Sequence, residues 1–407
     1  MYAETIREQR STLILLAVAT AIGAMGLAAG GSAGALLAEE MTGSTTWAGV
    51  PLGVLVLGSA AGALLISRQT SRAGRGAGLV LGYGVGVAGT VMVVAAAEID
   101  DFALLLAGSA ALGAANAAIF LTRYAAADLG GESGRGRALG VVFFATAVGA
   151  VASPNLLGPS GDVATTLGLP SLSGLYLVAF VAFGAAGALL AALPLRALRV
   201  SSEGVPRREL RAGLRRARLA LLVLGGSNLV MVAVMAIAPV HLAEHGHSLN
   251  FVGVAVGIHV LCMFAPSPLT GWLADRAGGV TVAAMGAALL VAAGGSGALL
   301  DLSDGTAMTA MLALLGLGWN AGVVGGSTML AGSVPAVLRP QTEGIGEVAM
   351  SLAAGAGAPI AGLIVAVGSM TALTLAGAVG GLFMLVALRL GERESRDALV
   401  ESSYRVE

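Results

Sequence analysis

The chain of 407 residues is 57% hydrophobic, 11% charged and 4% aromatic, and its formal net charge is −1. Soluble globular domains carry roughly twice that share of charged residues, and the mean hydropathy of +0.89 is likewise far too high for one. Composition therefore excludes a soluble enzyme. The 62 glycines favour helices that pack closely in lipid, and the single cysteine, Cys262, excludes an internal disulfide and a thiolate cluster.

Twelve apolar runs are long enough to cross a bilayer as helices, which takes about 20 residues each. We predict an all-α membrane protein with twelve transmembrane helices in two six-helix halves. The predicted spans lie at about 12–37, 47–67, 76–97, 103–127, 138–157, 173–195, 218–240, 250–273, 280–300, 306–334, 344–367 and 371–390.

Basic and acidic residues separate onto opposite sides of these spans. One set of loops carries arginines such as Arg68 and Arg135, whereas the other set has none and carries acidic residues such as Glu98, Asp101 and Asp304. Positively charged loops remain in the cytoplasm. We therefore predict a multi-pass protein of the cytoplasmic (inner) membrane with both termini in the cytoplasm.

An arginine-rich stretch divides the two halves. We predict a first half at 1–197, a cytoplasmic linker at 198–217, and a second half with a cytoplasmic tail at 218–407. We interpret the linker arginines as an anchor near anionic lipid headgroups. The lipid bilayer is thus an expected partner and nucleic acid is not; we expect a monomer.

Two matching segments follow the second and the eighth predicted span. The later one is Gly271-Trp-Leu-Ala-Asp275-Arg276-Ala-Gly, and the earlier one runs from Ser67 through Arg72 and Gly74 to Arg75. This repeat resembles the G-x-L-a-D-R-x-G-R signature of the major facilitator superfamily. The resemblance implies transport by alternating access, with gating by Gly271, Asp275, Arg276, Arg72 and Gly74 at the cytoplasmic face. Ser71 takes the place of the aspartate in the first copy, so only the second copy keeps the charge.

Two prolines in apolar runs favour hinges. Pro154 follows Gly149 and other small residues, a pattern similar to the span-five motif of drug/proton antiporters, and Pro359 follows Gly355 and Gly357. We predict that Pro154 and Pro359 belong to the gating machinery.

Three ionisable residues within or beside the spans have competing interpretations. We interpret Arg123 as snorkelling or pairing with Asp128, rather than as a proton carrier. Glu343 and Glu347 are interpreted as a solvated helix start, with proton coupling as the alternative.

All four histidines lie between positions 241 and 259. Met231 and Met235 share a face of span seven, and His259 and Met263 share a face of span eight, because each pair is four residues apart. At 1.5 Å rise per residue the two pairs overlap in depth. If both faces turn to the centre, three thioethers and one imidazole converge, a ligand set that favours Cu(I). The lower-ranked candidate ligands are His241, His245, His247 and Cys262.

The M-x-x-x-M and H-x-x-x-M pair resembles the CcoA-like copper importers of the major facilitator superfamily. The resemblance implies that Met231, Met235, His259 and Met263 bind copper. We accordingly predict a secondary-active transporter of copper, as Cu(I), moving inward, with handover to copper chaperones or thiols. The alternative is a proton-coupled exporter of hydrophobic drugs or other small organic compounds. We predict no enzymatic activity and no cofactor, the copper ion being substrate.

Overall fold

The computed structural model describes residues 2–27, 29, 33–152, 156–192 and 206–404, and every regular element in these ranges is a helix. The predicted all-α class is confirmed. Within the described residues, ten helices are long and apolar enough to cross a membrane. One of these, α5 (Phe102–Ala152), has 51 residues and turns at Gly131, where φ is 61° and ψ is −163°, so it contains two of the predicted spans.

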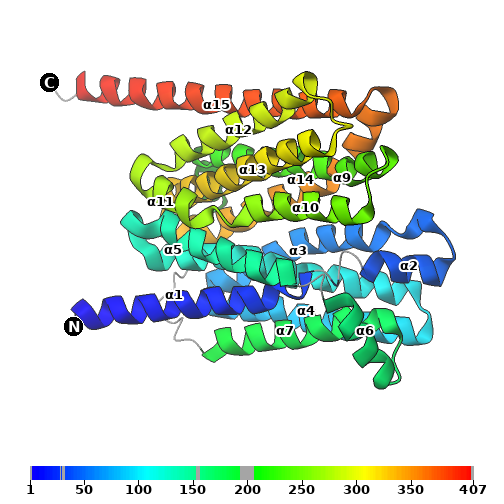
Figure 1. Cartoon of the computed structure of the whole chain (residues 1–407). Helices are drawn as coiled ribbons and strands as arrows, with labels where there is room; N and C mark the ends of the chain where they lie inside the picture. The colour runs from blue at the N-terminus through cyan, green and yellow to red at the C-terminus, as the bar shows by residue number, and fades with distance from the viewer. Residues whose placement is uncertain (1, 28, 30–32, 153–155, 193–205, 405–407) are drawn as a thin grey trace.

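The helices form two bundles, seen one above the other in Figure 1. The first bundle contains α1 (Tyr2–Ala24), α2 (Gly34–Thr42), α3 (Val50–Ala73), α4 (Arg75–Ile99), α5, α6 (Leu157–Thr166) and α7 (Gly174–Ala192). The second contains α9 (Arg218–Glu244), α10 (Leu249–Phe264), α11 (Ser267–Ala277), α12 (Gly279–Leu299), α13 (Gly305–Ser333), α14 (Arg339–Val367) and α15 (Met370–Tyr404), preceded by α8 (Arg207–Arg216). Short 3₁₀ turns lie at Thr45–Trp47, Ser171–Ser173 and Ala336–Leu338.

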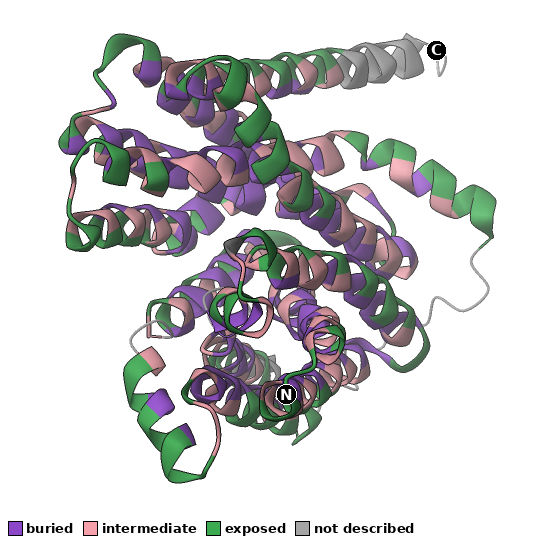
Figure 2. Cartoon of the chain, turned by 90° about the vertical axis from the view of Figure 1, so that its right-hand side faces the viewer, coloured by how far each residue is buried: buried purple, intermediate pink, exposed green. Residues whose placement is uncertain are grey.

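The two chain ends lie at the same end of the molecule, at the left of Figure 1, and α2 and α6 lie at the opposite end. We call these the linker end and the far end. Figure 2 looks at the molecule from the far end and shows buried residues concentrated inside each bundle and between the bundles. The exposed outer faces carry large apolar side chains such as Leu57, Val181 and Phe383. A lipid-facing surface requires this distribution.

The same turn is built twice at the linker end. Gly74 separates α3 from α4 with φ 94° and ψ 169°, and Gly278 separates α11 from α12 with φ 89° and ψ 150°. The amide of each glycine closes the preceding helix, on Thr70 O and on Ala274 O. Only glycine adopts this backbone region at low cost. The two glycines predicted from the sequence repeat therefore occupy equivalent structural positions.

The bundles touch backbone to backbone at two further glycines. A Cβ atom added at Gly271 of α11 would overlap the carbonyl oxygen of Gly136 in α5, and one added at Gly136 would overlap the carbonyl oxygen of Gly271. Since the obstacles are backbone atoms, rotamer changes cannot relieve either clash. The absence of side chains here is what allows the halves to close at the linker end.

We expect Gly136→Ala to open the linker end. The added methyl must push α5 from α11, and overpacking of this kind costs about 1–3 kcal/mol. Spin labels on the exposed positions Ser133 and Ala277, in a Cys262→Ser background, should report a longer distance or a second, longer population. The matched control is Gly257→Ala in α10, where an added Cβ meets nothing within 4 Å. An unchanged distance distribution in Gly136→Ala would contradict this account of closure.

Candidate transport site

A cavity of about 190 Å³ lies between the two bundles. The first bundle contributes residues of α3 and α5, and the second contributes residues of α9, α10, α13 and α14. The lining residues are Val56, Ser59, Asn116 and Phe120 on one side, and Asn228, Met231, Val232, Met263, Phe264, Trp319, Glu347, Met350, Ser351 and Ala354 on the other. Sites for drug-sized ligands are larger, about 300–1,000 Å³, so in this state the cavity fits a smaller solute.

Trp319 is held rigidly in the wall of the cavity. Its indole N–H donates to Asn228 Oδ1 at 2.9 Å, and Asn228 Nδ2 donates to the carbonyl oxygen of Met350 at 2.7 Å. The ring of Phe264 meets the indole edge to face at 5.4 Å, as does Phe143 of the first bundle at 6.2 Å. Buried indoles need such a partner for the N–H. The result is a fixed aromatic surface facing a small space.

A buried ion pair joins the bundles beside this space. The guanidinium of Arg123, on α5, lies 2.9 Å from Glu347 Oε2, on α14, and its Nε donates to the Ser327 hydroxyl of α13 at 3.1 Å. Arg123 is fully buried and Glu347 is 4% exposed. A charge inside a membrane protein is costly unless paired, and such pairs mark functional pathways.

The structure corrects the interpretations of the three ionisable residues. Arg123 neither snorkels nor pairs with Asp128, because its guanidinium is enclosed and bound to Glu347. Glu343 and Glu347 do not form a solvated helix start, since both are buried and each faces an arginine of the other bundle. Sequence spacing could not reveal these partners, which are more than 200 positions apart.

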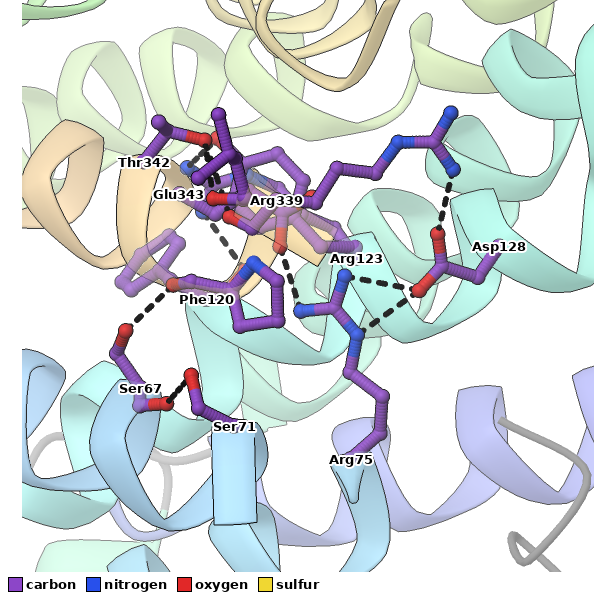
Figure 3. A network of polar contacts seen from close by, with 12 residues as sticks. Ser67, Ser71, Arg75, Phe120, Arg123, Asp128, Arg339, Thr342 and Glu343 are labelled. Carbon is purple, nitrogen blue, oxygen red and sulfur yellow. Dashed lines mark hydrogen bonds and ion pairs between the residues drawn. The ribbon is translucent and has the colours of Figure 1, made fainter. Parts of the chain in front are cut away.

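A second charged network lies at the linker end, and Figure 3 shows its contacts from close by. Arg75 lies at the start of α4, and its Nη1 donates to the Glu343 carboxylate of α14. Its Nε donates to Asp128 Oδ2 at 2.9 Å, and its Nη2 lies 2.8 Å from the same oxygen. Asp128 Oδ1 also lies 3.3 Å from Arg339 Nη1. Arginine and carboxylate charges alternate along this network, and the Arg75–Glu343 and Asp128–Arg339 pairs cross the boundary between the bundles. Opening this end requires separating them.

Asp275 of α11 caps a helical segment of α5 in the facing bundle. Its carboxylate accepts hydrogen bonds from the backbone amides of Gly136 and Arg137 at 2.6 and 3.0 Å, and from Arg137 Nε at 3.1 Å. These amides belong to the part of α5 that follows the turn at Gly131. A carboxylate stabilises free amides and the positive dipole end of a helix that begins there.

The first copy of the repeat contacts the facing bundle without a charge. Ser67, in the place of Gly271, donates its hydroxyl hydrogen to the carbonyl oxygen of Pro340 on α14, and Ser71 donates to Ser67 O at 3.0 Å. Both copies therefore contact the opposite bundle at the linker end.

The other predicted gating residues have different surroundings. Arg276 is exposed and stacks over the Trp272 ring at 5.5 Å, and Arg72 is also exposed. Pro359 is an exposed residue inside α14, and Pro154 lies outside the described residues.

The structure brings together part of the predicted metal set. Met231 and Met263 line the central cavity, together with Met350, which the sequence did not single out. Met235 instead packs with the separate apolar cluster that includes Ala238 and Leu312. Met231 and Met235 share a helical face, but helical spacing alone could not show that one lines the cavity and the other packs in an apolar core.

His259 is 1% exposed and is absent from the cavity lining. Its Nδ1 lies 2.7 Å from the carbonyl oxygen of Leu312, so that nitrogen carries the proton and donates it. Nε2 is buried and has no hydrogen-bond partner in the described structure. Cys262, the auxiliary candidate, is half-buried beside Gly316 of α13.

The remaining histidines lie at the far end. The rings of His241 and His245 are 4.2 Å apart, whereas His247 stacks on Phe251 and hydrogen-bonds to Ser303 O at 2.9 Å. Among the described residues, no three histidine, cysteine or acidic side chains are grouped so that they could hold a metal ion. Nearby, two hydrogen bonds from Ser303 lower the pKa of Asp301, because they stabilise its charged form.

Sequence reasoning missed the amides and the indole of the cavity. Asn116, Asn228 and Trp319 each lie within a predicted span. Amides in an apolar run are the available signal, since lipid offers them no partners. Their shared location, however, depends on how three helices, α5, α9 and α13, are rotated within the two bundles.

We expect the Arg123–Glu347 pair to show strong coupling in a double-mutant cycle. Arg123→Leu or Glu347→Leu alone leaves one buried charge uncompensated, which costs about 3–5 kcal/mol. The double variant should lose less than the sum, because no isolated charge remains. Thermal unfolding in detergent measures the three variants. Additive losses would show that the two side chains do not interact.

Comparison with known proteins places this architecture in a family. Residues 219–403 match the family model for the Major Facilitator Superfamily. The chain is 35% identical over 390 residues to the MFS-type transporter YddS of Bacillus subtilis, covering 92% of this chain and 89% of that protein. It is 28% identical to the riboflavin transporter RfnT of Brucella anthropi, covering 84% and 85% of the two chains.

A solved structure shows the same fold. The MFS transporter FucP in its outward conformation superposes with a TM-score of 0.74 at 17% identity, covering 94% of this chain and 99% of that one. Two helical bundles, a repeated linker-end turn and a cavity between the bundles agree with these relationships. The chain belongs to the major facilitator superfamily and is a membrane transporter, not an enzyme.

Proposed function

We propose that this secondary transporter carries a small organic solute with a flat, unsaturated portion, bound in the central cavity. The observation that carries the proposal is the fixed indole of Trp319, flanked by Phe264 and tied to Asn228. Rigid aromatic walls with a few placed polar groups are typical of organic ligand sites. The solute belongs to the small organic compounds of the alternative prediction from the sequence, but it is more polar than a hydrophobic drug and is imported rather than exported.

The opposite wall supplies hydrogen-bonding groups. Asn116 Nδ2 donates to Ser59 Oγ at 2.9 Å, which leaves the carbonyl oxygen of this amide to accept from a ligand. A solute stacked on Trp319 would thus contact both bundles at once. Riboflavin, the substrate in the name of RfnT, has a flat ring system of this kind but is of drug size. We therefore expect a smaller solute, or a cavity that widens on binding.

Glu347 is our candidate for coupling transport to protons. It lines the cavity and also holds Arg123 across the boundary between bundles. The linker end cannot open while this pair and the Arg75–Glu343 pair are intact. Protonation of Glu347 would remove the attraction, and a solute in the same cavity could control when that occurs.

We propose that the linker end faces the cytoplasm. Exposed arginines at this end include Arg68, Arg72 and Arg137, as the rule for cytoplasmic loops requires. Both termini would then be cytoplasmic and the protein would lie in the inner membrane. With the linker end closed, the cavity would receive solute from outside.

We expect Trp319→Ala to weaken binding of small aromatic solutes by roughly tenfold or more, from lost stacking and burial. Calorimetry on the purified protein, with a panel of heterocyclic acids, amides and riboflavin, provides the measurement. The matched control is Trp47→Ala, since Trp47 is exposed and remote from the cavity. In proteoliposomes, uptake of a bound solute should acidify the lumen, as read by an enclosed dye. Equal losses in both tryptophan variants would contradict the proposed site.

Cu(I) is a second candidate substrate, favoured by one specific observation. Three thioethers, from Met231, Met263 and Met350, line the same cavity. His259 precedes Met263 by one helical turn, and its Nδ1 is fixed while Nε2 has no partner. Thioethers and neutral imidazole are ligands that suit Cu(I).

If copper is the substrate, Met231→Ala with His259→Ala should abolish Cu(I) uptake into proteoliposomes under reducing conditions. Loss of two soft ligands leaves too few to compete for the ion. Met285→Ala is the matched control, because Met285 packs in the core away from the cavity. Absence of copper flux in the folded native protein would eliminate copper and leave the organic solute.

A further inference from the structure

Helix α8 is a short, strongly basic helix between the two bundles. Its ten residues, Arg207–Arg216, include five arginines and one glutamate, Glu209. Leu210 and Leu214 are half-buried and Gly213 is buried, whereas all five arginines are exposed. Gly213 and Leu214 follow Leu210 by three and four residues, so all three lie on one face of the helix. In Figure 2, α8 extends from the edge of the bundle beside the grey trace and is mostly exposed.

The inner face of α8 rests on the start of α14. A Cβ added at Gly213 would lie 3.0 Å from Leu338 Cδ1, 3.5 Å from Val334 Cγ1 and 3.9 Å from Thr342 Cγ2. Val334 directly follows α13, Leu338 ends the 3₁₀ turn before α14, and Thr342 belongs to the first turn of α14. The helix is therefore docked, and its position is tied to that of α14.

The depth of α8 follows from the chain itself. Only Ala217 separates it from α9, the first span of the second bundle. Ten helical residues extend about 15 Å, so no arginine lies farther than about that distance from the level at which that span enters the lipid. A bilayer around that span would place a layer of phospholipid headgroups beside these arginines.

We propose that the exposed arginines of α8 bind anionic phospholipid headgroups, and that this binding holds the linker end closed. Guanidinium groups match the oxygens of a phosphate in bidentate geometry. Attraction to an anionic leaflet grows with each arginine and fades within a Debye length. A helix that lies along the membrane surface keeps all its arginines within that distance.

The link to closure is the first turn of α14. Thr342, under α8, lies directly beside Glu343, which binds Arg75, and three residues after Arg339, which pairs with Asp128. Lipid that immobilises α8 also immobilises this turn in the position where both pairs form. Anionic lipid thus favours the linker-closed state.

The test compares the full-length protein in nanodiscs of phosphatidylcholine alone and of phosphatidylcholine mixed with phosphatidylglycerol. Hydrogen exchange of backbone amides is measured over 207–217 and 335–343. We expect several-fold slower exchange in both segments with phosphatidylglycerol. Replacing Arg207, Arg208, Arg211, Arg215 and Arg216 by Gln should abolish the lipid effect, and replacing them by Lys should keep most of it.

Two controls separate lipid binding from other effects. Arg10→Gln with Arg68→Gln removes exposed linker-end charge outside α8 and should leave the lipid effect intact. Inorganic phosphate added to phosphatidylcholine nanodiscs should not reproduce it. Equal exchange in both lipids, an effect that survives the Gln variant, or an equal response to free phosphate would overturn the proposal. No transported solute is needed, so the result is independent of the proposed substrate.

Discussion

The arrangement of this transporter depends on charges that are buried where water cannot reach them. Arg123 and Glu347, and Arg75 and Glu343, each bring a cation from the first bundle to a carboxylate on the second. An unpaired ion in such a place costs several kcal/mol. The two bundles are therefore held together at the linker end, and they can separate there only if protons or water replace the lost partners.

Small residues make this pairing sterically possible. Helices in lipid gain little from hydrophobic burial, so their association depends on close packing and polar contacts. Gly271 and Gly136 let α11 and α5 meet at their backbones, and Asp275 can then reach the amides of Gly136 and Arg137. One glycine contact thus brings a carboxylate to the start of a facing helix, which a longer side chain at either position would prevent.

The fold was predictable because it depends on local properties of the chain, but the site was not. Apolar runs marked the spans, and the repeated motif matched Gly74 with Gly278, which the structure shows in equivalent turns. By contrast, Met231 and Met235 share a helical face, yet one lines the cavity and the other packs in a core. The rotation of a helix within a bundle, and partners such as Arg123 and Glu347, arise only from tertiary packing.

Helix α14 unites the parts that a transport cycle must coordinate. Arg339, Glu343 and Glu347 are spaced four residues apart and so form one stripe, which Met350 and Ser351 extend into the cavity wall. The stripe thus runs from the linker-end network to the solute site on a single continuous helix. Pro359, which weakens the helix, lies beyond Ser351. Because no such interruption divides the stripe, a solute that displaces α14 at the cavity must also displace the carboxylates that close the linker end.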